Sequence, residues 1–592
     1  MPAELDRAIA RTQTHLLSLR NGQGHWEGEL SSSALSTATA IVALKLVDAA
    51  KHVDFIEKGA AWLRQHQNAD GGWGDTTISK SNLSTTLLGW SALHLLGVSS
   101  PAAENWIIAR TGSLEPAAIA KAVIARYGKD KTFSVPILML CSLCGTLGEK
   151  PWQHVIALPF ELAALPRTWF GAIGLPVVSY ALPALIAIGH IRFRKAPPAW
   201  WNPLRWLRAL AWRRVRPMLQ TLQPSSGGYL EATPLTSFVT MALAGAGDLD
   251  HPCLLLAVEF LHRSMRRDGA WPIDTNLATW GTTLAVRALE ESADPPVRRV
   301  VSDWLLSQQY REVHPFTNAA PGGWAWTDLP GGVPDADDTS SALIALHRLS
   351  APTFRNASFD IRHSASAGIQ WLLELQNRDG GIPTFCRGWG ALPFDRSTPE
   401  ITAHALLACW TWKAELPADL QKSIETATRR ALAYLKKNQA PDGSWFPLWF
   451  GNEHTPNETN PVYGTAQVLN HLGSHFDLAA SAADLIQAGL YFLGRAQKPD
   501  GSFGGDSLSS PSLEETAVAL HALCLSGASR SAIHLSLDWL IQATQHGTHF
   551  PSAPIGLYFA RLWYHERLYP VIWTLQALQS ARQQLYEDER SV

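Results

Sequence analysis

Apolar residues recur at helical spacing along most of the chain. Stretches such as residues 401–409 and 515–523 are rich in Ala and Leu, and their apolar positions fall three or four residues apart. That spacing places apolar side chains on one face of a helix, whereas a half-buried strand needs strict alternation, and the sequence has no convincing alternating run. The pattern therefore predicts an all-α protein in which loops separate the helices.

A turn motif repeats between the predicted helices. It consists of Gln-x-x-Asp-Gly, then Gly or Ser, then a large apolar residue that is usually aromatic. Asp-Gly favours a turn, and the glycine permits a left-handed backbone after a helix end. We expect the aromatic ring to fold back onto the preceding helix and the Gln amide to cap a helix terminus. The copies lie at residues 67–73, 376–382, 439–445 and 497–503, with degenerate copies at 22–26, 223–229 and 265–271. The repeat predicts helical hairpins that close into double-layer barrels or continue as an open solenoid.

Composition excludes several classes of protein. Charged residues make up 17% of the 592 residues, and the net charge of −2 argues against nucleic-acid binding by the whole chain. The six cysteines are too few for a disulfide scaffold. Cys141 and Cys144 lie in an apolar run, so we expect them in the core rather than on a metal. Residues 1–20 have the pattern of a helix and not of a signal peptide, which predicts a cytoplasmic protein.

Tryptophan is abundant, with 25 residues, and several tryptophans gather beside a basic stretch. Residues 168–191 carry no formal charge and are long enough to span a bilayer, but Pro176 and Pro183 interrupt them, so we favour a buried or interfacial segment. The next stretch, 192–216, contains basic and no acidic residues. It predicts either an interfacial helix, with indoles at headgroup depth and arginines near phosphates, or a solvated basic face. The residues concerned are Trp200, Trp201, Trp206, Trp212, Arg205, Arg208, Arg213, Arg214 and Arg216.

Three carboxylates gather at the start of a predicted helix, at Asp335, Asp337 and Asp338. One of them can cap the helix. Crowded carboxylates in an apolar site raise one another's pKa, so one can stay protonated and act as a Brønsted acid. Carboxylate oxygens can also bind a divalent cation. Spacing alone leaves the acid, the metal ligand and the helix cap open.

The repeats together with Asp335-x-Asp337-Asp338-Thr339 resemble the class II terpene cyclases, in particular the squalene-hopene cyclase branch, over most of the chain. In that family the middle Asp protonates an alkene, and a hydrogen-bonded His supports its acidity. The resemblance implies that Asp337 is the proton donor, flanked by Asp335 and Asp338, and that His404 in the segment 399–404 is its partner. It implies no organic cofactor and no metal.

Polyene cyclisation passes through carbocations, which aromatic faces stabilise without capturing them. The resemblance places a set of aromatic residues near the acid as substrate contacts, although any one of them can equally be a core residue. These residues are Trp169, Trp280, Trp324, Trp326, Phe385, Trp449, Tyr463 and Tyr558.

The sequence also departs from the family. Val333 stands where the family often has Tyr, the loop from Phe385 to His404 is short, and the C-terminal aromatic segment at 555–565 is altered. Thr37 and Leu88 stand where hopene-forming enzymes have glutamates that place the terminating water. We therefore expect the protonation step to be retained, while the ring count and the terminating step do not follow from the sequence.

The combined prediction is cyclisation of a linear polyprenyl hydrocarbon, with squalene as the expected substrate, to a polycyclic triterpene. We expect two double-layer α/α barrel domains with QW-type turns. Residues 20–264 form one, with a membrane-associated segment at about 168–216, and residues 265–592 form the catalytic one, on which helix 1–19 packs. The expected location is the cytoplasmic side of a membrane, as a peripheral or monotopic protein without a nucleic-acid partner, and a homodimer is compatible with this prediction.

Three alternatives remain. A class II cyclase of a prenyl diphosphate, of diterpene or sesquiterpene type, would need Mg²⁺ and diphosphate contacts. A zinc barrel of the prenyltransferase kind would need an Asp-x-Cys pair, which the sequence lacks. A non-catalytic helical-barrel binding protein would explain the repeats but not the acid motif among aromatic residues.

Overall fold

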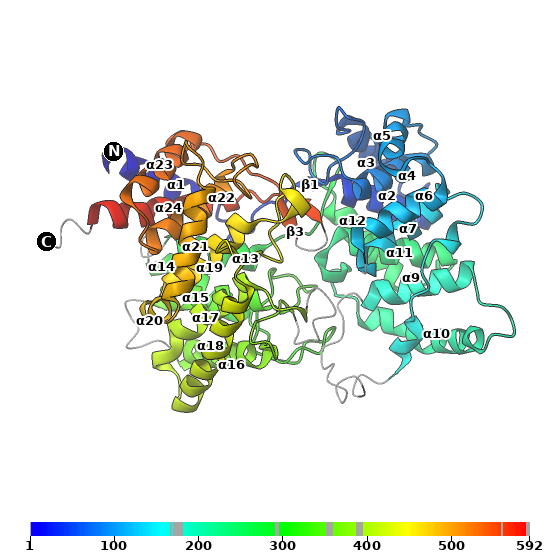
Figure 1. Ribbon diagram of the computed structural model, residues 1–592. Helices are drawn as coiled ribbons and strands as arrows, with labels where there is room; N and C mark the ends of the chain where they lie inside the picture. The colour runs from blue at the N-terminus through cyan, green and yellow to red at the C-terminus, as the bar shows by residue number, and fades with distance from the viewer. Residues whose placement is uncertain are drawn as a thin grey trace.

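The computed structural model describes residues 2–128, 130–165, 169, 182–289, 295–350, 359–385, 395–557 and 561–587. Two helical bodies lie side by side, one formed mainly by the N-terminal half of the chain and the other by the C-terminal half (Figure 1). The described strands are short: β1 (Ser32–Ser33) pairs antiparallel with β2 (Trp271–Pro272), and β3 (Ile555–Leu557) pairs antiparallel with β4 (Leu562–Tyr564). The prediction of an all-α fold is confirmed.

Within the described residues, six helices form a closed inner ring in the C-terminal body. Each helix contacts the next along the chain, and the last contacts the first. Every residue of the first helix is buried, because an inner helix faces the ring on one side and the outer layer on the other. In chain order the ring helices are α13 (Ala278–Leu289), α15 (Ala336–Ser350), α17 (Pro399–Trp412), α19 (Pro461–Gly473), α22 (Leu513–Leu525) and α24 (Tyr569–Arg582).

An outer layer of amphipathic helices covers this ring, each packed on an inner helix through its apolar face. Helix α1 (Pro2–Ser18) belongs to this layer because it packs on α24, at the opposite end of the sequence (Figure 1). The other outer helices are α14 (Pro295–Ser307), α16 (Phe359–Leu375), α18 (Ala418–Asn438), α21 (Ala483–Ala496) and α23 (Arg530–Ala543), and the short α20 (Phe476–Ser481) lies between α19 and α21.

The N-terminal body repeats the two-layer plan. Its inner helices are α2 (Ala34–Asp48), α4 (Leu83–Leu95), α7 (Lys131–Leu143), α9 (Leu182–Lys195) and α11 (Thr233–Ala246). Helix α4 contacts α2 and α7, and α11 contacts α2, α7 and α9. Its outer helices are α3 (Val53–Gln65), α5 (Pro101–Thr111), α6 (Pro116–Tyr127), α10 (Pro203–Thr221) and α12 (Cys253–Ser264). Short helical turns in the loops of the chain are η1 (Pro151–Gln153), η2 (Phe160–Ala164), η3 (Tyr229–Glu231), η7 (Lys413–Glu415), η8 (Pro456–Glu458) and η10 (Gln583–Glu587).

The repeated turn joins neighbouring hairpins. In the copy at 439–445, Gly443 has a φ of 93°, and a Cβ there would lie 2.1 Å from a backbone oxygen. The indole of Trp445 is fully buried and donates to a carbonyl of the preceding helix, α18, at 2.9 Å. These two predictions are confirmed. The amide of Gln439 does not cap a helix terminus, because it donates both to the turn and to a carbonyl within α21, so the glutamine ties one hairpin to the next.

The described cysteines confirm the expectation of core residues. All of them are buried and free, and they are Cys141, Cys144, Cys253, Cys409 and Cys524. Cys386 lies outside the described residues.

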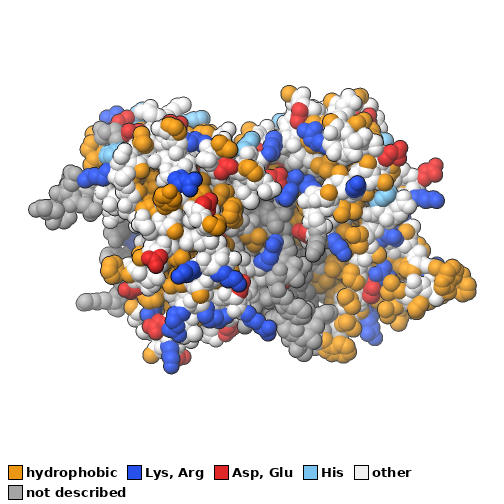
Figure 2. Space-filling model, in the orientation of Figure 1, with side chains coloured by type: hydrophobic (Ala, Val, Ile, Leu, Met, Phe, Trp, Pro, Cys, Tyr) orange, Lys and Arg blue, Asp and Glu red, His pale blue; other side chains and the backbone are white. Residues whose placement is uncertain are grey.

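Exposed apolar side chains gather around α10, at the lower right of the molecule (Figure 2). Three tryptophans there, Trp200, Trp201 and Trp206, are about two-thirds exposed. None of the described helices is long and apolar enough to cross a membrane.

Candidate active site

A cavity of about 1010 Å³ opens at the boundary between the two bodies. Leu230 and Ala232 line it from the N-terminal body. From the C-terminal body it is lined by residues of α13, α15, α24 and β4 and of the loops before α17 and α19. A second lobe of about 570 Å³ extends into the inner ring of the C-terminal body. Four residues line both lobes: Trp280, Asp337, Trp449 and Phe450. Asp337 therefore stands where the two lobes meet.

The three carboxylates of the acid motif line the larger lobe but have different roles. Oδ1 of Asp335 accepts the backbone N–H groups of Asp337 at 2.9 Å and Asp338 at 2.8 Å, so Asp335 caps the first turn of α15. Burial raises the pKa of Asp335 to about 7. Burial and the adjacent Asp335 carboxyl raise the pKa of Asp338 well above its usual range. Asp335 and Asp338 thus form a pair, and Asp337 is left to face another partner.

That partner is His404 on α17. Nδ1 of His404 lies 2.6 Å from Oδ1 of Asp337, although 67 residues separate the two in the chain. The Asp337 side chain is 21% exposed, and the space it faces is the cavity. Burial raises the pKa of Asp337 to about 7, while the positive charge of Arg287 opposes this rise. Such a carboxyl holds its proton in a dry site near neutral pH and can deliver it to a bound substrate.

The residue behind His404 is Arg287 on α13, which was not predicted from the sequence. Nη1 of Arg287 lies 3.0 Å from Nε2 of His404. The Arg287 side chain is buried, and burial lowers its pKa to about 10. A signal was present in the sequence, because Arg287 is the one charged residue in the apolar stretch that forms α13.

Five of the predicted aromatic residues line the cavity. Trp280, Trp326, Phe385 and Trp449 line the larger lobe, and Tyr463 lines the smaller one. The ring of Phe385 meets those of Trp326 and Trp449 edge to face, with centroids 6.1 and 6.0 Å apart. The aromatic lining also includes residues that the sequence did not point to, namely Phe450, Tyr564, Tyr569 and Trp573. The cavity therefore offers π faces on several sides, which suits a carbocation.

Backbone contacts at the start of α13 hold Trp280 and Trp326 together. The N–H groups of Thr279 and Trp280 both donate to the carbonyl of Trp326, at 3.0 and 3.1 Å. The next residue, Thr327, donates to the side chain of Asn276 at 2.6 Å. The helix start and the loop that carries Trp326 are thus fixed to each other.

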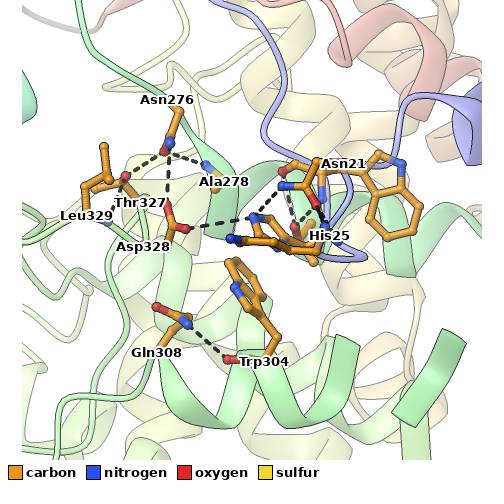
Figure 3. Close-up of polar contacts among 12 residues, drawn as sticks. Asn21, His25, Asn276, Ala278, Trp304, Gln308, Thr327, Asp328 and Leu329 are labelled. Carbon is orange, nitrogen blue, oxygen red and sulfur yellow. Dashed lines mark hydrogen bonds and ion pairs between the residues drawn. The ribbon is translucent and has the colours of Figure 1, made fainter. Parts of the chain in front are cut away.

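A polar network supports this loop from behind (Figure 3). Asp328 accepts from the Asn276 amide at 3.4 Å and lies 3.8 Å from Nε2 of His25. The His25 ring stacks on Trp304 of α14, with centroids 4.1 Å apart. His25 comes from the segment between α1 and α2, so the N-terminal part of the chain supports one wall of the cavity.

Two predicted substrate contacts, Trp324 and Trp169, are not among the described residues that line the cavity. Trp324 is fully buried, and its indole donates to the carbonyl of Leu305 at 2.8 Å, so it lies in the core and not at the cavity. Trp326, two residues later in the chain, does line the cavity. Trp169 is 62% exposed and lines neither lobe as the described residues form them. Tyr558 lies outside the described residues.

Another carboxyl, also missed, faces the larger lobe. Asp274 lines this lobe, and burial together with the nearby Glu231 raises its pKa well above the usual range. Glu231 accepts the N–H of Gly331 at 2.7 Å.

Thr37 and Leu88, which stand where hopene-forming enzymes have glutamates, are buried within α2 and α4. Neither is among the described residues that line the lobes.

Two family models match the chain: the squalene-hopene cyclase C-terminal domain over residues 275–583 and the squalene-hopene cyclase N-terminal domain over residues 9–181. The squalene–hopene cyclase of Alicyclobacillus acidocaldarius subsp. acidocaldarius is 26% identical over 79% of this chain and 78% of that protein. A probable squalene–hopene cyclase of Sinorhizobium fredii is 24% identical over 98% of both chains. The solved structure of an ent-copalyl diphosphate synthase from Streptomyces platensis shares the fold over 98% of both chains, with a TM-score of 0.57 and 18% identity. The chain belongs to the squalene-hopene cyclase family and is a class II terpene cyclase.

Proposed function

We propose that this cyclase converts squalene to a polycyclic triterpene, with Asp337 as the proton donor. The proposal rests on the position of the Asp337 carboxyl. It lies where the two lobes of the aromatic-lined cavity meet, and it is hydrogen-bonded to the buried His404. Protonation of a terminal alkene by Asp337 would form a C–H bond from the π electrons and leave a tertiary cation. Successive alkenes then attack the cation, and the flanking indole and phenyl faces stabilise each charge without adding to it.

The lining of the larger lobe favours a hydrocarbon over a diphosphate. Apart from Thr384, its described residues are aliphatic, aromatic or acidic, and they include neither Lys nor Arg. A diphosphate group needs basic side chains or a metal to balance its charge, whereas a neutral polyene needs only an apolar surface. The names of the two curated relatives also support squalene.

Product analysis with alternative substrates tests this assignment. Purified enzyme is incubated with squalene and with geranylgeranyl diphosphate, each with and without EDTA, and the products are identified by gas chromatography with mass spectrometry. Cyclised squalene from the wild type, insensitive to EDTA and missing with Asp337→Asn, supports the proposal. Conversion of the diphosphate alone would replace it with a prenyl diphosphate cyclase.

The proposal includes attachment to a membrane surface through α10. A long hydrocarbon substrate is insoluble in water and must be taken from a bilayer. Trp200, Trp201, Trp206, Leu207 and Leu210 form an exposed apolar group at the start of α10 (Figure 2). Indoles favour the headgroup region of a membrane, and apolar side chains beside them can enter the acyl boundary.

Some residues of the basic stretch do not take part in this surface. Arg208 is buried and forms an ion pair with Glu161 at 3.0 Å. The ring of Trp212 stacks on His190 with centroids 3.5 Å apart, so it faces the protein. Both residues were expected at the membrane, but they lie on the side of α10 that packs on the N-terminal body. The exposed arginines of α10 are Arg213 and Arg214.

Vesicle flotation tests the attachment. The double variant Trp206→Ser and Leu210→Ser should lower the fraction bound to vesicles that contain anionic lipid, while activity on detergent-dispersed squalene is kept. Phe476→Ser is the matched control, because Phe476 is 84% exposed on α20 in the other body. Equal flotation of the double variant and the control would refute attachment through α10.

A further inference from the structure

Arg287 is a buried charge without a carboxylate bound to it. Its side chain is 6% exposed, and Nε has no hydrogen-bond partner among the described residues. No described carboxylate forms an ion pair with the guanidinium. A buried cation that is not neutralised in this way destabilises a fold, so its presence beside the acid points to a role in the reaction.

The contact with His404 fixes the position of the histidine proton. A guanidinium can donate hydrogen bonds but cannot accept them. Nε2 of His404, 3.0 Å from Nη1 of Arg287, must therefore accept and carries no proton. The ring proton then sits on Nδ1, where it donates to Oδ1 of Asp337 at 2.6 Å. An imidazolium would set one N–H against another, so His404 is neutral in this arrangement.

We propose that Arg287 is a positioning residue that holds His404 as the neutral Nδ1–H tautomer and supplies the positive charge that balances Asp337 after proton transfer. This inference rests on the proposed role of Asp337 as the acid. Oδ1 of Asp337 accepts the hydrogen bond from the N–H group of His404. Oδ2 of Asp337 is therefore left to carry the acidic proton.

The proton transfer from Asp337 to the alkene breaks one bond and forms one bond. The O–H bond of Asp337 breaks, and a C–H bond forms from the alkene π electrons. The remaining carboxylate keeps the hydrogen bond from His404, with the charge of Arg287 behind the ring. His404 gives up no proton, and Arg287 keeps all of its own.

The other groups around Arg287 do not compete for this role. Burial and the charge of Arg287 lower the pKa values of His404 and His471 well below the usual range, and the pKa of His521 falls to about 3 from burial, Arg287 and Arg348. These histidines are therefore neutral, and the ring of His471 stacks on His404 with centroids 4.2 Å apart. The ionisable groups that act on Arg287 or feel its charge are Asp337 and Arg348 on α15, His404 on α17, Tyr463 and His471 on α19, and His521 on α22. Asp337 is the member of this set whose charge changes in the step.

A charge-neutral variant and a charge-keeping variant separate this role from packing. With squalene cyclisation as the assay, Arg287→Met should lose at least about tenfold in rate. The alkaline limb of its pH–rate profile should also move up by about one pH unit. The reason is that a nearby opposite charge lowers a carboxyl pKa by about 1–3 units, so its removal raises the pKa of Asp337. Arg287→Lys should keep the limb near that of the wild type. Arg126→Met removes a half-buried arginine of the N-terminal body, paired with Glu458 at 3.2 Å, and should leave the limb unchanged.

The tautomer can be measured directly on the wild type, so the inference does not depend on how Arg287→Met folds. ¹⁵N NMR of histidine-labelled enzyme, with the His404 signals assigned from His404→Gln, should show the neutral Nδ1–H form between pH 6 and 8. An imidazolium or an Nε2–H form in the wild type would overturn the inference, as would an unshifted limb in folded Arg287→Met. The NMR measurement uses no substrate, so it tests the tautomer independently of the reaction. Failure of the wild type to cyclise squalene would therefore count against the proposed substrate and not against the tautomer.

Discussion

Replacing Asp337 with Asn tests the proposed acid most directly. The amide keeps the size of the side chain but has no acidic proton, so turnover should fall by about 10²–10⁴-fold or more. In the wild type the rate depends on the protonated carboxyl, whose pKa is about 7. The wild-type rate should therefore be highest below this pH and fall as the pH rises through it.

The same variant should change stability in a pH-dependent way. The folded-state pKa of Asp337, about 7, lies above the ordinary pKa of an aspartate, 3.8, so the proton is bound more tightly in the folded state. The wild type therefore loses stability as the pH rises from about 4 to about 7. Between pH 5 and pH 8 the loss corresponds to about two pKa units, or about 3 kcal/mol of unfolding free energy. Asp337→Asn lacks this titration, so its stability relative to the wild type should rise by about that amount over the range.

Urea unfolding followed by tryptophan fluorescence at pH 5 and pH 8, with product analysis in parallel, measures both effects. Asp54→Asn is the control, because it makes the same substitution at an exposed position on α3. A folded Asp337→Asn that keeps activity within tenfold of the wild type would show that another group donates the proton. A stability difference that is the same at both pH values would show that this carboxyl does not have a raised pKa.

Three further results are expected. His404→Ala should reduce the rate less than Asp337→Asn, because the acid itself remains, and initial rates at pH 6 would contradict this if the order were reversed. Trp445→Ala should lower the free energy of unfolding by about 3–5 kcal/mol in urea titrations, since its ring is wholly buried. Trp449→Ala should cost less stability, because Trp449 borders the cavity. It should instead yield products with fewer rings, since a π face is lost from the cavity wall, and an unchanged product profile would place Trp449 outside the reaction path.

Local chemistry made much of the fold predictable. The Asp-Gly turn and its following aromatic act within a few residues, as the left-handed Gly443 and the buried Trp445 illustrate. The role of Gln439 was predicted wrongly because its second acceptor is a carbonyl of α21, and a contact between hairpins is not encoded in the spacing of one turn.

The candidate site was only partly predictable from the sequence. The acid motif and the segment around His404 are short patterns that resemble the family, so the resemblance could point to both residues. Which aromatic residues face the cavity depends on packing: Trp324 and Trp326 are two positions apart, yet one lies in the core and the other on the cavity wall. The same holds for α10, where Trp206 is exposed while Trp212 packs against the protein.

By itself, the sequence determined the helical class, the turn chemistry, the family resemblance and the position of the acid, because each depends on residues close together in the chain. The tertiary structure alone decided what surrounds the acid. Closing the inner ring brings α13, α15 and α17 side by side and places Arg287 against His404, 117 residues away, and His404 against Asp337. Buried charge and hydrogen bonding depend on these distances in space, which is why the sequence could indicate an acid but not the arginine behind it.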